Sequence, residues 1–421
     1  MTKTDLLERI GNGENSQVEF KRDTIDNRAL AKEIVAFLNL RGGCVLLGVD
    51  DDASVVGLSR RDGDARDRTY AGLEQWVMQT GRDKIRPEVI PSFQVIRDVE
   101  PGLDVAVVEV DAGWSVHHVW HDKHYIPYIR VGSLSREMSP DARERIYQQR
   151  GSVRVELRPV TGTSLEDFDV PRLERYFGTI RHQTPPPGTN EDWERLLTNT
   201  ELMIEEDSGI RATVAGLLLF GRTPNRYLPQ AGVDVAAYPG VEKDYAASGR
   251  DSLRGPMVPL LAETSGEVTD AGLVERALEF VNRHAGVSAT IEAGRRVDRR
   301  TYPEDVVREV IVNALVHRDY SLSATNIEIS LYRDRLEVIS PGRLPNGITP
   351  ERMRAGARAA RNQLLKDVMR DYRYMEHMAM GVSRKVVRGM WAHNQTEPDL
   401  LEGEESFTVR LWAGPQGAAG N

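Results

Sequence analysis

The chain has 421 residues, a formal net charge of −9 at pH 7 and one cysteine, Cys44, so an intramolecular disulfide is excluded. Its composition, 40% hydrophobic and 28% charged, is that of a folded globular protein with room for about two to four domains. An acidic chain is not expected to coat nucleic acid non-specifically, because that mode depends on many Lys and Arg side chains, although local basic patches can still bind. No apolar run approaches a membrane span of about 18 residues and no secretory leader opens the sequence, so we expect a cytoplasmic protein with no membrane partner.

The first third of the sequence predicts alternating helices and strands. We expect a short helix over 5–10, a half-buried strand over 16–21, an amphipathic helix over 28–40 and an apolar strand over 44–49. Two further strands are expected over 105–110 and 125–131. These elements predict an α/β domain over residues 1–150.

Three acidic residues of this domain are candidate catalytic and metal-binding residues. Glu19 belongs to the strand over 16–21, Asp50 follows the strand over 44–49, and Glu14 precedes both. Carboxylates that converge at one sheet edge can hold a divalent cation that activates water for phosphodiester cleavage, and Lys21 can steady the phosphate. The alternative is a surface pair of Glu19 and Lys21 beside a polar turn.

Four histidines lie close together near the end of this domain. His117, His118, His121 and His124 are residue types that bind zinc as neutral imidazoles. Their spacing matches no standard zinc motif, and the neighbouring aromatic residues favour a packed loop.

The rest of the sequence predicts a linker and two further regions. Proline and glycine interrupt residues 151–195, a helical or mixed region covers 196–300, and a last domain covers 301–413 before a small-residue tail at 414–421. Strands are expected over 327–332, 335–340 and 407–412. Basic residues gather over 295–300 and 352–370, which are either solvated faces or phosphate contacts.

One apolar helix of the last domain carries a polar stripe. Glu309, Asn313 and His317 follow one another at four-residue steps, which places them on one helical face. A carboxylate one turn before an amide can orient a water and complete the coordination of Mg²⁺, which prefers oxygen ligands and bridges to phosphates. The alternative is a helix half-buried beside a polar groove.

The motifs of the first third resemble the Schlafen AlbA-type domain, a nucleic-acid-binding module. The motifs are Glu14-Asn-Ser-Gln-Val-Glu-Phe-Lys21, Ala36-Phe-Leu-Asn-Leu-Arg-Gly-Gly43, Leu47-Gly-Val-Asp-Asp51 and Tyr128-Ile-Arg-Val-Gly-Ser133. In Schlafen nucleases, two glutamates and an aspartate carry metal-dependent cleavage of transfer and ribosomal RNA. The resemblance gives these roles to Glu14, Glu19 and Asp50, with Asp51 as a rival for the third. Many bacterial relatives are described only as DNA-binding or regulatory, so the resemblance supports nucleic-acid contact better than cleavage.

The later part of the chain resembles RecG-related transcriptional regulators. The resemblance is carried by Thr213-Val-Ala-Gly-Leu-Leu-Leu-Phe-Gly221, Tyr302-Pro303 and residues 308–321. The last domain of that family is similar to the GHKL ATPase fold, an α/β sandwich. The likeness implies that Glu309 activates water and that Asn313 binds the Mg²⁺ of ATP. The other residues that it places at the nucleotide are His317, Asp319, Ser340, Gly342, Arg361, Asn362 and Gly381.

The sequence departs from the GHKL pattern at two glycine motifs. Ser340 stands near the position of the aspartate that reads adenine, and Gly381 is a single glycine where relatives have Gly-x-Gly. No Walker-type phosphate loop is present in the sequence, so no helicase is implied. We therefore expect a mixed α/β (α+β) protein that binds nucleic acid as a regulator, forms a homo-oligomer and has an altered ATP-binding domain. The alternative is an endoribonuclease dependent on Mg²⁺ or Mn²⁺ that cleaves transfer RNA or a similar RNA in antiviral defence.

Overall fold

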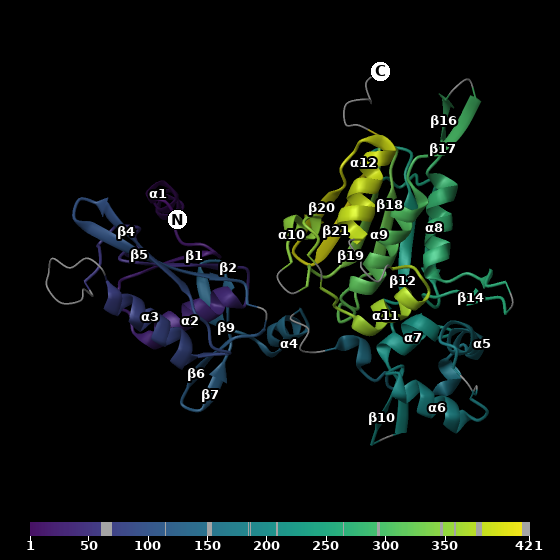
Figure 1. Cartoon of the computed structure of the whole chain (residues 1–421), viewed down its shortest axis with the longest axis horizontal. Helices are drawn as coiled ribbons and strands as arrows, with labels where there is room; N and C mark the ends of the chain where they lie inside the picture. The colour runs from purple at the N-terminus through teal and green to yellow at the C-terminus, as the bar shows by residue number, and fades with distance from the viewer. Residues whose placement is uncertain are drawn as a thin grey trace. The chain divides into compact units, whose positions relative to one another are not determined.

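The computed structural model describes residues 1–59, 70–113, 115–149, 154–183, 185, 187–207, 209–263, 265–292, 295–345, 348–357, 359–375 and 381–414. The chain divides into two compact units, Met1–Val153 and Arg154–Asn421. Both units combine helices with sheets (Figure 1), which confirms the expected mixed α+β class. No helix in the described ranges has both the length and the apolar character needed to cross a membrane.

A four-stranded sheet in the order β1-β2-β5-β4 forms the centre of the first unit. Its strands are β1 (Val18–Lys21), β2 (Gly42–Leu47), β5 (Leu103–Asp111) and β4 (Ser92–Glu100). β1 and β2 are parallel because α2 (Asn27–Leu38) crosses between them, whereas the other neighbours are antiparallel. The apolar side chains of α2 and α3 (Ala71–Lys84) pack on one face of the sheet, and those of α1 (Lys3–Gly11) pack on the other.

Smaller elements complete this unit. They are β3 (Ile85–Arg86), β6 (His118–His121), β7 (His124–Ile126), β8 (Tyr128–Val131), β9 (Leu134–Glu137) and α4 (Pro140–Gln149). The single strand expected over 125–131 is wrong, since β7 and β8 belong to different sheets and Pro127 lies between them. Proline has no N–H to donate to a ladder, which explains the break.

The second unit is built on a six-stranded sheet in the order β13-β12-β18-β19-β21-β20. The strands are β13 (Gly249–Arg254), β12 (Gly232–Ala237), β18 (Ile327–Leu331), β19 (Arg335–Pro341), β21 (Ser406–Trp412) and β20 (Asp399–Glu402). Only the pair β12 and β18 is parallel among these neighbours. Because β12 and β18 share one sheet, a domain boundary at residue 300 would divide it.

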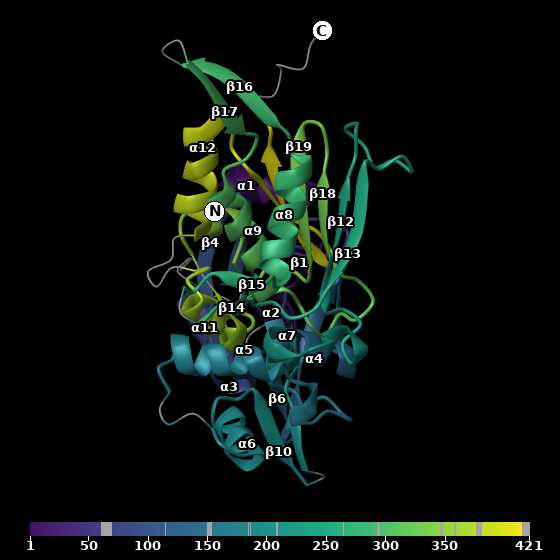
Figure 2. The same ribbon diagram turned by 90° about the vertical axis from the view of Figure 1, so that its right-hand side faces the viewer.

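Helices α8 (Leu273–His284) and α9 (Glu304–His317) lie side by side against this sheet (Figures 1 and 2). Between them, β16 (Val287–Glu292) and β17 (Arg295–Arg300) form a hairpin that extends beyond the end of α8 in both views. After β19 the chain forms α10 (Pro350–Arg354), α11 (Gln363–Asp371), η5 (Gly381–Val387) and α12 (Arg388–Asn394). Together with the sheet, α9, α10, α11 and η5 enclose the cavity described below.

The region between the first unit and β12 is made of short elements. They are η1 (Val155–Leu157), η2 (Leu165–Asp167), α5 (Val170–Glu174), η3 (Arg175–Ile180), α6 (Asn190–Asn199), β10 (Met203–Glu206), β11 (Gly209–Ala212), α7 (Val214–Phe220) and η4 (Pro224–Arg226). The strands β14 (Leu260–Leu261) and β15 (Val268–Asp270) precede α8, within the region over 196–300 that the sequence predicts to be helical or mixed. A short strand pair next to a helix carries too few residues to show a period of its own.

Candidate functional site

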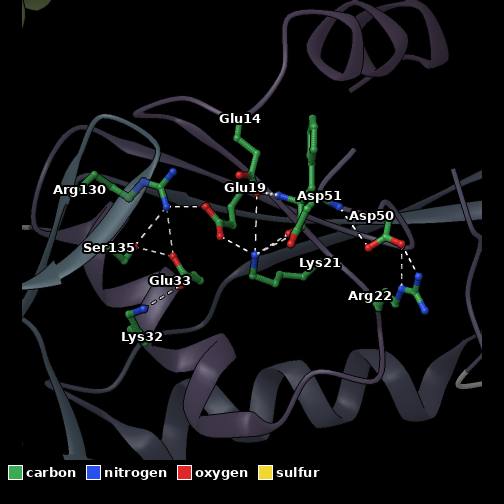
Figure 3. Close-up of polar contacts among 11 residues, drawn as sticks. Glu14, Glu19, Lys21, Arg22, Lys32, Glu33, Asp50, Asp51, Arg130 and Ser135 are labelled. Carbon is green, nitrogen blue, oxygen red and sulfur yellow. Dashed lines mark hydrogen bonds and ion pairs between the residues drawn. The ribbon is translucent and has the colours of Figure 1, made fainter. Parts of the chain in front are cut away.

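In the first unit, the ammonium group of Lys21 lies among three carboxylates (Figure 3). Its Nζ is 2.7 Å from Oε1 of Glu19, 3.6 Å from Oδ1 of Asp51 and 3.9 Å from Oε1 of Glu14. The same ammonium donates to the carbonyl oxygen of Phe20 at 2.8 Å. The cation at the centre of this carboxylate cluster is therefore a side chain of the protein itself.

The cluster changes the acidity of its own members. Burial raises the pKa of the Glu14 carboxyl and the charges of Glu19 and Asp51 add to this, against the bond from the Phe20 N–H and the charge of Lys21. Burial acts to lower the pKa of Lys21, but the bond to Glu19 and the neighbouring carboxylates outweigh it and raise the pKa. Lys21 is therefore held in its charged form, whereas Glu14 takes up a proton more readily than an exposed glutamate.

Asp50 is turned away from this cluster. It accepts a hydrogen bond from Nε of Arg22 at 3.1 Å and a second, shorter one from Nη2 (Figure 3), and these bonds lower the pKa of Asp50. The chain turns at Gly48, whose φ of +98° is in the left-handed region that favours glycine. After this turn Asp51, the rival for the third acidic role, is the aspartate near Lys21.

A buried arginine neutralises Glu19 from its other side. The side chain of Arg130 has no exposed surface, and its Nη1 is 2.5 Å from Oε2 of Glu19 and 3.1 Å from Oε2 of Glu33. Its Nη2 donates to the carbonyl oxygen of Asn15 at 2.6 Å, and Ser135 Oγ donates to Glu33. Neither Arg130 nor Glu33 was expected at the site. The signal for Arg130 was its place in the Tyr128-Ile-Arg-Val-Gly-Ser133 motif, where a charged residue follows two apolar ones.

The cluster does not fit a divalent metal ion as it is arranged. Carboxylate oxygens are the ligands that Mg²⁺ and Mn²⁺ prefer, and Glu14, Glu19 and Asp51 provide them. The positive charge of Lys21, however, lies between these oxygens. Across the described residues, no group of three or more His, Cys, Asp or Glu side chains is arranged to hold a metal.

Three of the four histidines of this unit contact neighbouring protein groups, and the fourth is exposed. Nδ1 of His117 lies 3.0 Å from the carbonyl oxygen of Ser115, and Nε2 of His118 lies 3.0 Å from the hydroxyl of Tyr147. His121 contacts Asp122 at 2.9 Å, and His124 is exposed. Burial lowers the pKa of His118. These contacts agree with a packed hairpin, the reading that the aromatic neighbours favoured.

In the second unit, the polar stripe of α9 lines a cavity of about 140 Å³. Glu309, Asn313 and His317 all border it, on the helix that the four-residue spacing predicted. The opposite wall is formed by β19, β21 and β20, where Val338 pairs with Val409 and Ser340 pairs with Phe407. Most of the remaining lining is apolar and includes Val310, Leu344, Ile348, Met353, Met375 and Val386.

Glu309 and Asn313 are bonded to each other. The Asn313 amide donates to Oε1 of Glu309 at 2.9 Å and to its backbone carbonyl at 2.8 Å. On its other oxygen, the buried Glu309 carboxylate lies 3.5 Å from Nζ of Lys385. The carboxylate is thus oriented by an amide and balanced by one cation.

His317 is a neutral imidazole at physiological pH. Burial lowers the pKa of His317 to about 4, and the positive charges of Arg361 and Lys366 add to the effect. Its Nδ1 is buried and has no hydrogen-bond partner among the described residues. The ring can therefore offer one donor and one acceptor, but no charge, at this end of the stripe.

Two of the other expected nucleotide-binding residues, Ser340 and Gly342, border the cavity. The hydroxyl of Ser340 donates to the backbone carbonyl of Ala314 at 3.0 Å, so its proton is already used within the fold. Gly342 has a φ of +104°, and a Cβ there would lie 2.5 Å from the Cβ of Asp319 and 2.7 Å from Nη1 of Arg361. This glycine is required by close packing.

The side chains of Arg361 and Asn362 donate hydrogen bonds to backbone carbonyls at the end of α9. Nη1 of Arg361 donates to the carbonyl of His317 at 2.6 Å, and the Asn362 amide donates to the carbonyls of Val316 and Arg318 at 2.8 and 2.9 Å. Both side chains are buried, and neither borders the cavity. They satisfy carbonyl groups that a helix end leaves without partners.

Asp319 also lies outside the cavity lining. The Asp319 carboxylate accepts bonds from the N–H of Ser321 at 3.0 Å and from its hydroxyl at 2.6 Å. Gly381 begins η5, and residues 376–380 of its motif lie outside the described residues.

Comparisons with known proteins agree with the two-part organisation. Residues 14–139 match the family model described as "Schlafen, AlbA_2", and residues 324–411 match the one described as "Putative ATP-dependent DNA helicase recG C-terminal". The second match begins after α9. A comparison with curated proteins finds no match.

Two solved structures are similar to the chain. The DIP2311 protein from Corynebacterium diphtheriae is 20% identical over 98% of this chain and 80% of that one, with a TM-score of 0.45. The N-terminal domain of a "Putative ATP-dependent DNA Helicase RecG-related Protein" from Nitrosomonas europaea is 22% identical over 33% of this chain and 94% of that one, with a TM-score of 0.24. The family matches by themselves indicate an AlbA-like domain in the first unit and an ATPase-like domain, similar to the RecG C-terminal family, in the second.

Proposed function

We propose that this protein is a nucleic-acid-binding regulator that does not cleave the nucleic acid it binds. The two domain matches support a nucleic-acid-related role. The observation that carries the proposal against cleavage is the position of Lys21, whose ammonium lies among Glu14, Glu19 and Asp51. A catalytic Mg²⁺ or Mn²⁺ needs those oxygens.

The surroundings of Glu19 oppose a rearrangement that would admit a metal. Glu19 is 5% exposed and is held by Lys21 on one oxygen and by Arg130 on the other. Moving Lys21 away to admit a metal ion breaks its short contact with Glu19 and its bond to the carbonyl of Phe20. The cluster therefore serves best as a fixed, charge-balanced support for the β1 edge.

The hairpin of β16 and β17 is the contact surface that we propose for nucleic acid. Its register pairs Val287 with Arg300 and Glu292 with Arg295, so β17 carries four arginines along one two-stranded ribbon. Arg296 and Arg300 occupy one set of alternating positions, and Arg295 and Arg299 occupy the other. A two-stranded ribbon fits the major groove of a duplex, and arginines contact phosphates and guanine edges.

The basic residues over 352–370 are less suited to nucleic acid than the hairpin, because their side chains are dispersed. Arg354 donates to the carbonyl of Pro398, Arg370 contacts Asp367 at 3.0 Å, and Arg361 is buried. Lys366 borders the cavity. These cations do not form one surface, so the segment 352–370 is not proposed as a phosphate-binding face.

For the cavity of the second unit, we propose a different role: it holds a small ligand that regulates nucleic-acid binding.

The experiment incubates the full chain with labelled transfer RNA, single-stranded DNA and duplex DNA, in Mg²⁺ or in Mn²⁺. We expect complexes in a gel-shift assay that weaken as salt rises, and no cleavage products. Replacing Arg296 and Arg299 with Gln is expected to weaken binding about tenfold, since phosphate contacts dominate affinity. The matched control replaces Arg82 and Arg195, whose side chains are 68% and 71% exposed, and is expected to bind as the wild type does.

The second candidate function is a metal-dependent nuclease, favoured by the convergence of Glu14, Glu19 and Asp51 on one cation. It predicts metal-dependent products that disappear in Glu14→Gln, a conservative change at a partly exposed residue, and in Glu19→Ala. Such products would overturn the binding-only proposal. In addition, Lys21→Ala is expected to gain Mn²⁺ binding in calorimetry because it vacates the centre of the cluster.

A further inference from the structure

We propose that the cavity of the second unit binds a small, mainly apolar organic acid that carries one negative charge, with Lys366 as its anchor. This inference rests on the proposed function in taking the cavity as the site of a regulatory ligand. It adds the chemical class of that ligand, and the argument depends on the charges and the lining of the cavity.

Among the described residues at the cavity, one cation has no anion beside it. Arg343 is paired with Glu402 at 3.4 Å, and Lys385 is paired with Glu309 at 3.5 Å. Lys366 also borders the cavity and is half-buried, yet it has no carboxylate within 4.0 Å in the part of the chain that the structure describes. A half-buried cation gains most from a single anionic partner, because burial without one is costly.

The apolar lining of the cavity favours an anion whose remaining part is also apolar. β19 and β21 contribute Val338, Phe407 and Val409, and the opposite side contributes Ile348, Met353 and Val386. The volume of about 140 Å³ corresponds to roughly five water molecules at about 30 Å³ each. This space suits one ring or a short branched chain attached to a carboxylate.

The same cavity is poorly suited to the triphosphate of ATP. A triphosphate needs several donors and cations together, whereas Arg361 and Asn362 donate to backbone carbonyls and the Ser340 hydroxyl donates to Ala314. The neutral imidazole of His317 adds a hydrogen-bonding group without charge. Among the described residues, Lys366 and His317 at the lining can therefore satisfy one carboxylate, whereas three phosphate groups would need more cations and donors than these residues leave available.

The test titrates phenylacetate, benzoate and hexanoate, the neutral analogue phenylacetamide, and Mg·ATP into the full chain by calorimetry. We expect at least one of the three acids to bind, and phenylacetamide to bind at least about tenfold more weakly than phenylacetate, the effect of losing one charged hydrogen bond. Lys366→Met should bring the acid and the amide to equal, weak affinity. The control Lys243→Met, which removes an exposed lysine paired with Glu328, should leave both affinities unchanged.

A second variant tests the apolar walls independently of the charge. Ala314→Leu adds bulk at the lining and should abolish acid binding while Lys366 is retained. Thermal unfolding of each variant shows whether it folds. Three results overturn the proposal: none of the acids binds to the wild type, acid and amide bind equally, or Mg·ATP binds more tightly than the acids in competition with them.

The readouts separate this proposal from the proposed function. Nucleic-acid binding is measured in the same preparations without any acid. Retained nucleic-acid binding with no acid binding overturns the acid site alone. Acid binding in a protein that binds no nucleic acid overturns the proposed function and leaves the ligand class standing.

Discussion

The two polar sites of this protein handle charge in opposite ways. At the β1 edge of the first unit, Lys21 and Arg130 lie directly against the carboxylates, so each negative group near the centre has a cation of the protein beside it. At the α9 cavity, apolar walls surround a neutral imidazole and one lysine without an anion among the described residues. In the first site, side chains of the protein balance the carboxylates, whereas the second leaves a half-buried lysine beside an open cavity, which is why we propose a ligand only for the second.

The largest expected effect is at the buried arginine of the charge-balanced cluster. Arg130→Met leaves Glu19 and Glu33 buried without their shared cation. Removing one partner of a buried ion pair is expected to lower the free energy of unfolding by about 3–5 kcal/mol. Urea unfolding of the full chain, followed by circular dichroism, measures the change.

The control for this prediction is Arg22→Met. Arg22 pairs with Asp50 at the surface, where its side chain is 61% exposed, so solvent screens the pair and no shift of the urea midpoint is expected. A loss as large as that of Arg130→Met would contradict the distinction between the buried and exposed pairs.

The next largest effect is a pH dependence of the free energy of unfolding, caused by His317 at the cavity. Because the pKa of His317 falls from 6.5 to about 4 on folding, the unfolded chain takes up a proton first as the pH drops. The contribution of this group to stability is therefore complete above pH 6.5 and is lost progressively between about 6.5 and 4. At pH 5 the loss relative to pH 7 is expected to be about 2 kcal/mol.

His317→Gln should remove this dependence. The measurement compares the free energies of unfolding of the two proteins at pH 7 and pH 5. The variant is expected to lose less stability than the wild type by that same amount. Equal losses in both proteins would show that His317 is protonated to the same extent in the folded and unfolded chains.

The smallest effect compares the two lysines directly. Lys21→Met removes a cation in short contact with Glu19 and is expected to cost about 1 kcal/mol, because Arg130 still neutralises that glutamate. Lys366→Met removes a half-buried cation with no described anion and is expected to be neutral or slightly stabilising. The urea midpoint should fall in Lys21→Met and should stay level or rise slightly in Lys366→Met. A clear loss of stability in Lys366→Met would mean that this lysine is already paired in the free protein.

The sequence was sufficient where one periodic element decided the outcome. The four-residue spacing of Glu309, Asn313 and His317 predicted one helical face, and α9 does place all three at one cavity. The strands over 44–49 and 105–110 were likewise evident from their apolar runs and became neighbours β2 and β5.

Contacts between distant residues could not be predicted in this way. Arg130 is 111 residues from Glu19 in the sequence, and no local pattern indicates that they meet. Whether Asp50 or Asp51 lies near Lys21 depends on the turn at Gly48, because a shift of one residue in this turn changes which carboxylate faces the lysine. The donors of Arg361 and Asn362 face the end of α9, which only the packing of α11 against that helix determines.

The parallel pairing of β12 with β18 has a practical consequence for anyone who divides this gene. A fragment that starts at residue 301 keeps β18 but lacks Val233–Ala237, the segment that hydrogen-bonds along its length. The unpaired backbone of β18 then becomes a template for other chains, and such a product is expected to self-associate. An expression clone of the ATPase-like half therefore has to begin before residue 232.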